Sequence, residues 1–382
     1  MKDRLISHRR DLLTVLLMLA VIAGSLWFAS TRDTSFTMLT ANGITYPEAT
    51  IVRVQEEHLD REEGTNRFLG HQVLEVRLET GMGAGETVLA ENSLSADHNV
   101  LGRVGERVII KAERQEGIAP YYSVFNYDRM GKSALVFGLF ALCMVVVGGL
   151  KGLRSMIGLA FAMLMIILLL VPAVFSGIPA VPAGLAVMII ITIFSMLLLN
   201  GWSPKTYAAI GSTVLGMAVA AGVYVLFSSI LVVSGFNKGD AEELILIAQT
   251  TGLDVQATLF VGVLVASLGA VMDMCMSIAT ALFELKDQHP TLSRTQMVTS
   301  AFNMGRDMIG TMCQTLILAF TGSSLTSMLV LMAYGVDMAQ LISSDYMAVE
   351  LLHSFVGGIA VIACVPVTAF VCAAVTKEPA SS

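Results

Sequence analysis

Apolar residues gather into long stretches separated by short polar segments, and one much longer polar segment follows the first stretch. A helix that crosses the hydrocarbon part of a bilayer needs about 20 mainly apolar residues. By that rule the chain predicts eight membrane-spanning helices, at residues 11–29, 133–150, 155–175, 183–200, 206–233, 255–283, 308–334 and 346–375. The pattern favours a polytopic α-helical membrane protein.

The polar segment at residues 30–132 has a different periodicity. Apolar and polar residues alternate over short runs such as 49–55 and 106–111, and glycine-rich turns separate these runs. Alternation with a period of two predicts strands with one buried face. About four to six short strands favour a small closed β-barrel of the OB-like kind, because closure hides the sheet edges.

The first apolar stretch follows a basic N-terminus, as the apolar part of a signal peptide does. We interpret it as an uncleaved anchor, because it exceeds a typical signal-peptide core and no A-x-A cleavage site follows it. The predicted organisation has four parts. These are an N-terminus with its anchor helix at 1–29, an extracytoplasmic β domain at 30–132, a seven-helix transmembrane domain at 133–376 and a tail at 377–382.

Lysine and arginine predict the orientation, because short cytoplasmic loops carry an excess of both. With the N-terminus inside, the inner segments hold nearly all of the basic residues outside the β domain. The short outer loops hold Lys238 and several acids, among them Asp240, Glu242 and Glu243. This asymmetry predicts that both termini are cytoplasmic. We expect the chain to lie in the plasma membrane of a bacterial cell.

Composition agrees with a membrane protein, because 55% of the residues are hydrophobic and 14% are charged, against about 25% charged in soluble domains. The net charge of −7 and the absence of a long basic tract give no support for binding nucleic acid. No Walker A, G-x-S-x-G or H-E-x-x-H motif occurs, so neither an ATP-driven pump nor a nucleophilic or zinc hydrolase is indicated. We expect no cofactor, and an enzyme is the least supported class.

The first group of candidate site residues lies in the stretch at 255–283 and just beyond it. Asp273, Ser277, Thr280 and Glu284 recur at spacings of four, three and four, so all four share one helix face. An ionised aspartate at the centre of a membrane helix costs about 2.5–3.5 kcal/mol, so such a residue is usually paired, protonated or functional. We expect Asp273 to lie deep in the bilayer and Glu284 near the inner interface.

A second polar stripe follows on the next helix. Asn303, Asp307, Gly310 and Gln314 form it, with Arg306 on its flank. A cytoplasmic helix that begins near residue 292 is expected to run directly into the seventh span. Arg306 would then pair with Glu284 or Asp307, although an interfacial ion pair of purely structural value explains Arg306 equally well.

Two further sets of residues are weaker candidates. One set supplies places where a helix can break or approach a neighbour closely: Gly269, Gly305, Gly310, Gly322, Ser323 and Ser324. The other is Glu350 with His353, whose one-turn spacing suits a metal ion or a proton relay but is weak evidence alone.

Several of these segments resemble the bacterial YibE/F-like membrane proteins. The resemblance rests on residues 269–279, 303–312 and 315–325, and extends to Glu91–Ser95, Tyr127–Arg129 and Lys151–Arg154. It implies an integral bacterial membrane protein with a β domain after its first span, and it implies that Asp273, Asn303, Arg306 and Asp307 are motif positions. His353 is not part of the resemblance, and no established activity comes with it.

The leading functional hypothesis is a permease that moves a small solute or ion, coupled to protons or cations through Asp273. An anionic substrate would favour Arg306 as its ligand, whereas a cation would favour Asp273, Asn303 and Ser277. The alternative is a membrane scaffold or sensor whose β domain binds a protein or an envelope polymer. Self-association of the chain is open under both hypotheses.

Overall fold

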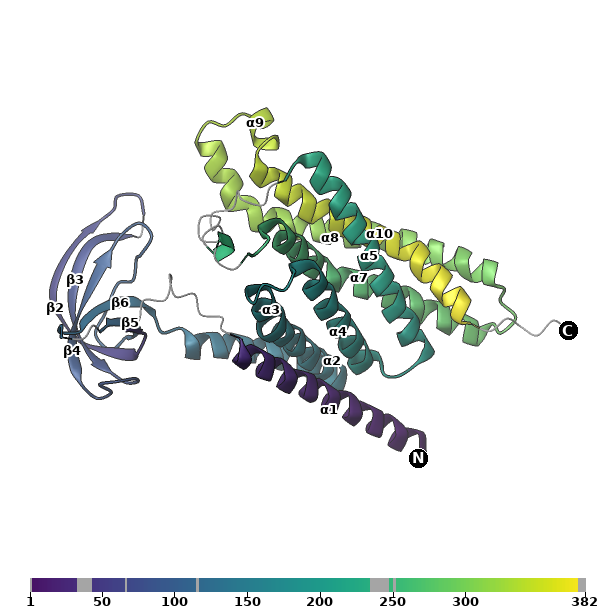
Figure 1. Ribbon diagram of the computed structural model, residues 1–382, viewed down its shortest axis with the longest axis horizontal. Coiled ribbons are helices and arrows are strands. Elements are labelled where there is room, and N and C mark those ends of the chain that lie inside the picture. The colour runs from purple at the N-terminus through teal and green to yellow at the C-terminus, as the bar shows by residue number, and fades with distance from the viewer. Residues whose placement is uncertain are drawn as a thin grey trace. The chain divides into compact units, whose positions relative to one another are not determined.

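The computed structural model describes residues 2–32, 43–65, 67–114, 117–233, 247–249 and 252–376 (Figure 1). The predicted outer loop with Lys238, Asp240, Glu242 and Glu243 lies outside these residues, as does the predicted tail at 377–382. The chain divides into two compact units. One holds residues 1–34 and 147–382, and the other holds residues 35–146.

The second unit contains a small β-barrel, as the alternating pattern predicts. Its strands are β1 (Ile44–Thr45), β2 (Glu48–Arg61), β3 (Phe68–Leu78), β4 (Thr87–Leu94), β5 (Arg107–Glu113) and β6 (Tyr121–Tyr127). The sheet has the order β1-β5-β2-β3-β4-β6, and β5 also pairs with β6, so five strands close into a barrel. All pairings are antiparallel except the one between β4 and β6.

The barrel interior combines aliphatic residues with a buried amide network. Ile51, Leu74 and Ile110 are among its fully buried side chains. Gln72 and Asn92 are also buried, and Asn92 Nδ2 donates to Gln72 Oε1 at 2.9 Å and to the carbonyl of Val100 at 2.7 Å. Gln72 Oε1 in turn accepts from the amide of Gly102 at 3.0 Å. The two amides therefore fasten the loop between β4 and β5 across the barrel.

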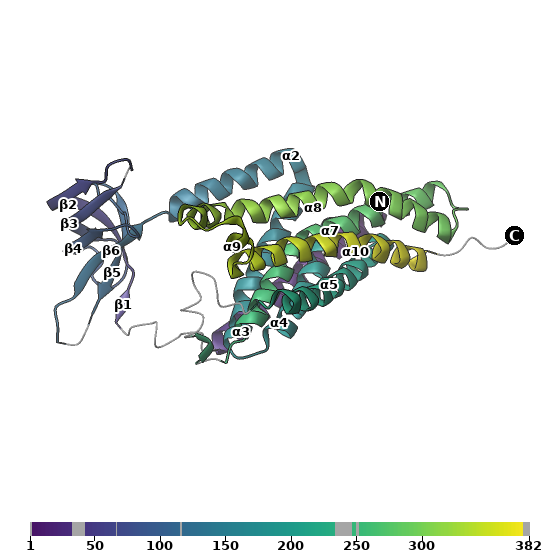
Figure 2. The same ribbon diagram turned by 90° about the horizontal axis from the view of Figure 1, so that it is seen from above.

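Among the described residues, seven helices are long and apolar enough to cross a membrane, rather than the eight predicted from the sequence. They are α1 (Lys2–Thr31), the continuous segment of α2 (Met130–Met165), the π-helix η1 (Ile166–Leu170) and α3 (Val171–Phe175), then α4 (Ala180–Asn200), α5 (Pro204–Leu231), α7 (Val255–Gln288), α8 (Arg294–Ala333) and α10 (Asp345–Val375). Between α8 and α10 lies the short α9 (Met338–Ile342), at the turn of the chain (Figure 2).

The difference in number arises at Gly149, at the end of the second predicted span. No loop interrupts the segment at this position, but Gly149 has φ 57° and ψ −137°, which is far from helical geometry. A glycine adopts a positive φ without the steric cost that a side chain adds. The segment at 130–175 therefore consists of two helical parts that meet at a break at Gly149, and it counts as one of the seven helices because no loop separates the parts.

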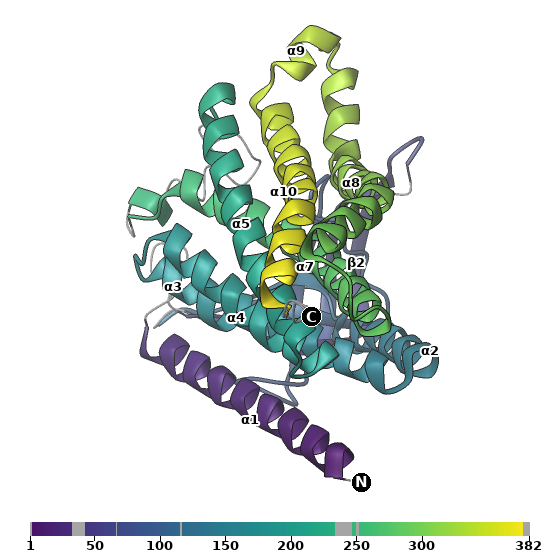
Figure 3. The same cartoon turned by 90° about the vertical axis from the view of Figure 1, so that its right-hand side faces the viewer.

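The helical unit packs around α7 and α10. Figure 3 shows α10 between α5 and α8, and its fully buried residues include Leu352, Cys364 and Ala369. Helix α1 is attached by polar contacts as well as by packing: Arg154 and Asp11 form a salt bridge of 2.6 Å, and Trp202 Nε1 donates to Thr14 Oγ1 at 2.8 Å. This helix contains the first predicted span, at residues 11–29, which we interpret from the sequence as an uncleaved anchor.

Candidate functional site

Helix α7 presents its polar residues on the face opposite to the packed core. Val271, Met274, Cys275 and Ile278 are completely buried against the rest of the unit. Asp273, Ser277 and Glu284 are exposed, and Thr280 is half-buried. The predicted stripe therefore exists as one helix face, but it does not point into the helical core.

Asp273 lies near the middle of α7. The helix begins at Asp254, whose carboxylate accepts the amide of Ala257 at 3.0 Å and acts as the N-cap. At about 1.5 Å per residue, Asp273 is about 27 Å from the first helical residue and about 22 Å from the last. Glu284 lies only one turn from the C-terminal end, at Gln288.

Helix α8 is continuous from Arg294 to Ala333, as the sequence predicts for a helix that runs straight into the seventh span. Its start is fixed by a capping box, in which Ser293 Oγ accepts the amide of Gln296 at 3.2 Å and Gln296 Oε1 accepts the amide of Ser293 at 2.9 Å. The helix passes through its glycines without a break.

One face of α8 packs on α10, and the two helices run antiparallel. The interface extends from a contact between Met297 and Thr376 at one end to a contact between Ser324 and Tyr346 at the other. A Cβ added to Gly305 would lie 2.4 Å from Val365 Cγ1, so only glycine allows this approach. Gly269, Gly310 and Gly322 have open space where a Cβ would stand.

The polar stripe of α8 lies on the opposite side from α10. Asn303, Arg306, Asp307 and Gln314 are all exposed, while Gly305 between them is buried. Ser323 Oγ donates to the carbonyl of Phe320 at 2.7 Å, which is a local bond within the helix. Ser324 is 2% exposed, and its hydroxyl has no hydrogen-bond partner among the described residues.

The ion pair expected for Arg306 is not formed. Among the residues that the structure describes, no salt bridge within 4.0 Å involves Asp273, Glu284, Arg306 or Asp307. Arg306 and Asp307 are adjacent in sequence, and neighbouring positions of a helix point in different directions. Four charged side chains thus lie on the outer faces of two consecutive apolar helices.

Glu350 and His353 do come together. His353 Nδ1 lies 3.9 Å from Glu350 Oε2, and the imidazole stacks on the ring of Phe320 with centroids 5.5 Å apart. Both side chains are largely buried, at 11% and 14% exposure. No group of three or more His, Cys, Asp or Glu residues that could hold a metal ion occurs within the described part of the chain.

A polar contact between α5 and α7 was not among the predicted site residues. Gln256 Nε2 donates to Ser228 Oγ at 3.0 Å and to the carbonyl of Val233 at 2.9 Å. Gln256 and Ser228 line a pocket of about 690 Å³ together with Tyr224 and Asp254. The available signal was Gln256 itself, an amide two residues after the N-cap of an apolar helix.

The helical region agrees with a known protein family. The sequence model of the YibE/F-like protein family matches residues 136–378, which is more than half of the chain. The chain belongs to the YibE/F-like family. The match includes every candidate site residue on α7, α8 and α10, but the barrel strands of this YibE/F-like protein precede it. Comparison with curated proteins gives no match, and comparison with solved structures gives none either.

Proposed function

We propose that this YibE/F-like protein is a multi-pass membrane permease for a small solute or ion, with the exposed polar faces of α7 and α8 as its path. The observation that carries this proposal is the placement of Asp273, Arg306 and Asp307 on outward helix faces without a salt bridge to any described residue. Charged groups at membrane depth usually face a hydrated path or a protein partner, because contact with lipid is costly.

Asp273 supports the proposal most strongly. A hydrocarbon layer about 30 Å thick spans about 20 residues of an upright helix. Because α7 has 34 residues, every stretch of that length within Val255–Gln288 includes Asp273. Helix α8 has 40 residues, so no single position in it is placed in the hydrocarbon by length alone. Asp273 is therefore the residue for which a coupling or binding role has the clearest physical reason.

The proposed topology follows from the break at Gly149. If the parts of the 130–175 segment on either side of Gly149 each cross the bilayer, the chain crosses it eight times and both termini lie on one side. The excess of lysine and arginine in the segments on that side supports a cytoplasmic location in a bacterial plasma membrane. The barrel would then lie outside the cytoplasm.

Flux measurements test the transport proposal. Purified protein in liposomes, under imposed pH and salt gradients, should move protons or cations, and Asp273→Asn should lower the initial rate about tenfold or more. Asp254→Asn is the matched control, because it makes the same change on the same helix and asparagine caps a helix equally well. Equal flux from wild type and Asp273→Asn would contradict a role for this carboxylate.

A second candidate function is a scaffold or sensor that acts through the barrel. The closed order of five strands, with a parallel pairing of β4 and β6, supports an OB-like barrel, a fold that binds oligomeric ligands or proteins. Tyr46, Tyr121 and Phe125 are about half exposed on it, at 51%, 46% and 49%. Exposed aromatic residues are enriched where proteins bind partners. This alternative predicts that Asp273 can be replaced without loss of function, whereas these aromatic residues cannot.

A further inference from the structure

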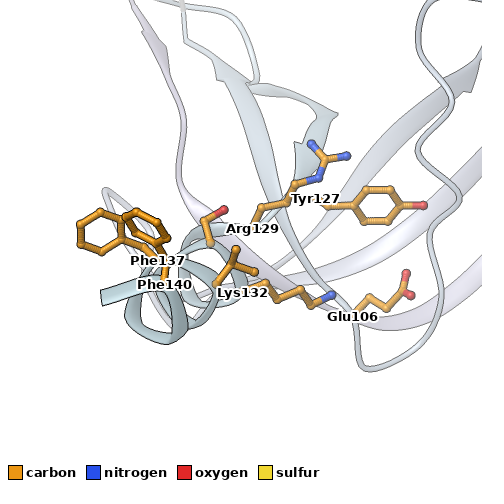
Figure 4. Close-up of a pocket in the computed structure, with 8 residues that line it drawn as sticks. Glu106, Tyr127, Arg129, Lys132, Phe137 and Phe140 are labelled. Atoms are coloured by element: carbon orange, nitrogen blue, oxygen red, sulfur yellow. The ribbon is translucent and has the colours of Figure 1, made fainter. Parts of the chain in front are cut away.

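The junction between the barrel and α2 contains a pocket that the transport proposal does not use. The pocket has a volume of about 670 Å³. It is lined by the last residue of β6, the first turns of α2 and one residue of the loop before β5 (Figure 4): Tyr127, Arg129, Lys132, Ser133, Val136, Phe137, Phe140 and Glu106. All of these residues belong to the same compact unit.

The chain is held firmly where it enters this pocket. Tyr127 Oη accepts the amide of Leu101 at 2.8 Å, which ties the end of β6 to the loop between β4 and β5. Asp128 Oδ1 accepts the amide of Met130 at 3.0 Å and so caps the start of α2. The polar end of the pocket is therefore built on fixed backbone.

Two basic residues and one acid line this end of the pocket. The guanidinium of Arg129 stacks over the Tyr127 ring at 5.4 Å, and its Nη1 donates to Asn126 Oδ1 at 2.9 Å. Lys132 is exposed, and its side chain extends toward Glu106 in Figure 4. Within the described residues these two groups form no salt bridge.

The neighbouring aspartate pairs with an arginine of the barrel. Asp128 Oδ2 lies 3.5 Å from Arg107 Nε, and the same arginine also binds Glu48 and Glu79. Asp128 is therefore engaged on the barrel side of the junction. Among the residues that line the pocket, the two cations exceed the one acid by one charge, which favours an anion.

The other end of the pocket is apolar and open. Val136, Phe137 and Phe140 are 70%, 56% and 48% exposed, and they lie on neighbouring positions of one helix face. Figure 4 shows the two phenylalanine rings together, on the side away from Glu106. A cationic end and an apolar wall along a single pocket fit a ligand that has an anionic head and a hydrocarbon chain.

We propose that this pocket binds an anionic phospholipid, with its phosphate between Arg129 and Lys132 and an acyl chain along Val136, Phe137 and Phe140. The lipid, rather than a soluble phosphate ester, follows because the apolar wall continues directly into a helix long and apolar enough to cross a membrane. The inference rests on the proposed membrane placement of α2 but not on transport. A bound lipid would fix the barrel at the bilayer surface.

Lipid retention by the full-length protein tests this inference. The protein is reconstituted in phosphatidylcholine with or without phosphatidylglycerol, released into detergent, and its retained lipids are counted by native mass spectrometry. Wild type should retain phosphatidylglycerol in preference to phosphatidylcholine, and the double variant Arg129→Gln/Lys132→Gln should lose about tenfold in apparent affinity for each cation removed. Equal retention of both lipids by wild type would overturn the proposal.

Matched variants separate lipid binding from loss of structure. Arg32→Gln removes an arginine that also stacks on an aromatic ring at the end of an apolar helix, over Phe28 at 5.2 Å, and should leave retention unchanged. Glu106→Gln should raise retention severalfold, a gain that a damaged fold would not give. Loss of the lipid on adding inorganic phosphate alone would instead identify a site for free phosphate and overturn the lipid assignment. The readout is binding, so a failure here is distinguishable from a failure of transport.

Discussion

The barrel and the helical unit differ in the burial and pairing of their polar side chains. Gln72 and Asn92 are buried inside the barrel, where their amides bond to each other and to the loop that crosses it. On α7 and α8, Asp273, Arg306 and Asp307 are exposed and have no salt bridge to any described residue. Polar groups that stabilise a fold are normally satisfied within it. The contrast assigns the barrel amides to stability, and it is the reason why the proposed function rests on the charges of α7 and α8.

Removing a barrel amide should have the largest effect on stability. Gln72→Ala leaves the amide of Gly102 and the side chain of Asn92 without their shared acceptor, and it opens a cavity. We expect a loss of about 3 kcal/mol in the free energy of unfolding. Hydrogen exchange of the β3 and β4 amides in the full-length protein measures this loss. Ser93→Ala, at the exposed neighbour of Asn92, should cost less than about 0.5 kcal/mol, and an equal cost would contradict the assignment.

Alanine substitutions at two glycines of α8 should change the stability of the protein in opposite directions. Gly305→Ala places a Cβ against Val365 and should destabilise the packing of α8 on α10 by about 1–3 kcal/mol. Gly310→Ala meets open space and should gain up to about 1 kcal/mol from helix propensity. Thermal unfolding of the detergent-solubilised protein compares them. If both substitutions destabilised the protein by similar amounts, Gly310 would be covered by a partner and the prediction would be wrong.

Replacing the central carboxylate should hardly change stability. Asp273→Asn removes the charge of an exposed side chain that has no salt bridge among the described residues, so the free energy of unfolding should change by no more than about 0.5 kcal/mol. The same thermal unfolding assay applies. A loss as large as that of Gln72→Ala would show that Asp273 stabilises the fold, and the contrast between the two units would fail.

The smallest effect concerns Glu79 in the barrel. A hydrogen bond from Thr50, followed by the nearby Arg107 guanidinium, holds the pKa of this carboxyl below its usual value. A lowered pKa stabilises the fold above the unfolded value, about 4.3, and that contribution is lost as the pH falls through the folded pKa. Wild type should therefore lose slightly more stability on acidification than Glu79→Gln. Identical pH dependence would contradict the assignment.

Much of the fold was predictable because its signals are local. The apolar stretches predicted the helices, and period-two alternation predicted the barrel strands. The helix expected to begin near residue 292 and to run into the seventh span is continuous from Arg294. The second predicted span ends at residue 150, next to the break at Gly149. The sequence did not show that the next helical part follows this break without a loop.

The site was predictable as helix faces but not as an arrangement. Spacing places Asp273 and Ser277 on one face of α7, yet it does not say whether that face meets the core. The burial of a face depends on how α7 packs against its neighbours. Helix α7 packs through another face, which carries Val271, Met274 and Ile278. The prediction of an ion pair for Arg306 was wrong for the same reason, because such pairing depends on how each helix is rotated about its axis.

The most direct test of the central claim asks whether the polar face of α7 is hydrated, because that result does not depend on knowing the substrate. In a Cys143→Ser background, Ser277→Cys should react with a charged, membrane-impermeant thiol reagent in proteoliposomes. Val219→Cys, at an exposed position on the apolar face of α5, should not. Labelling of Ser277→Cys alone is the predicted result. Equal protection of both cysteines would contradict the account, because it would leave Asp273 facing lipid or a dry protein contact.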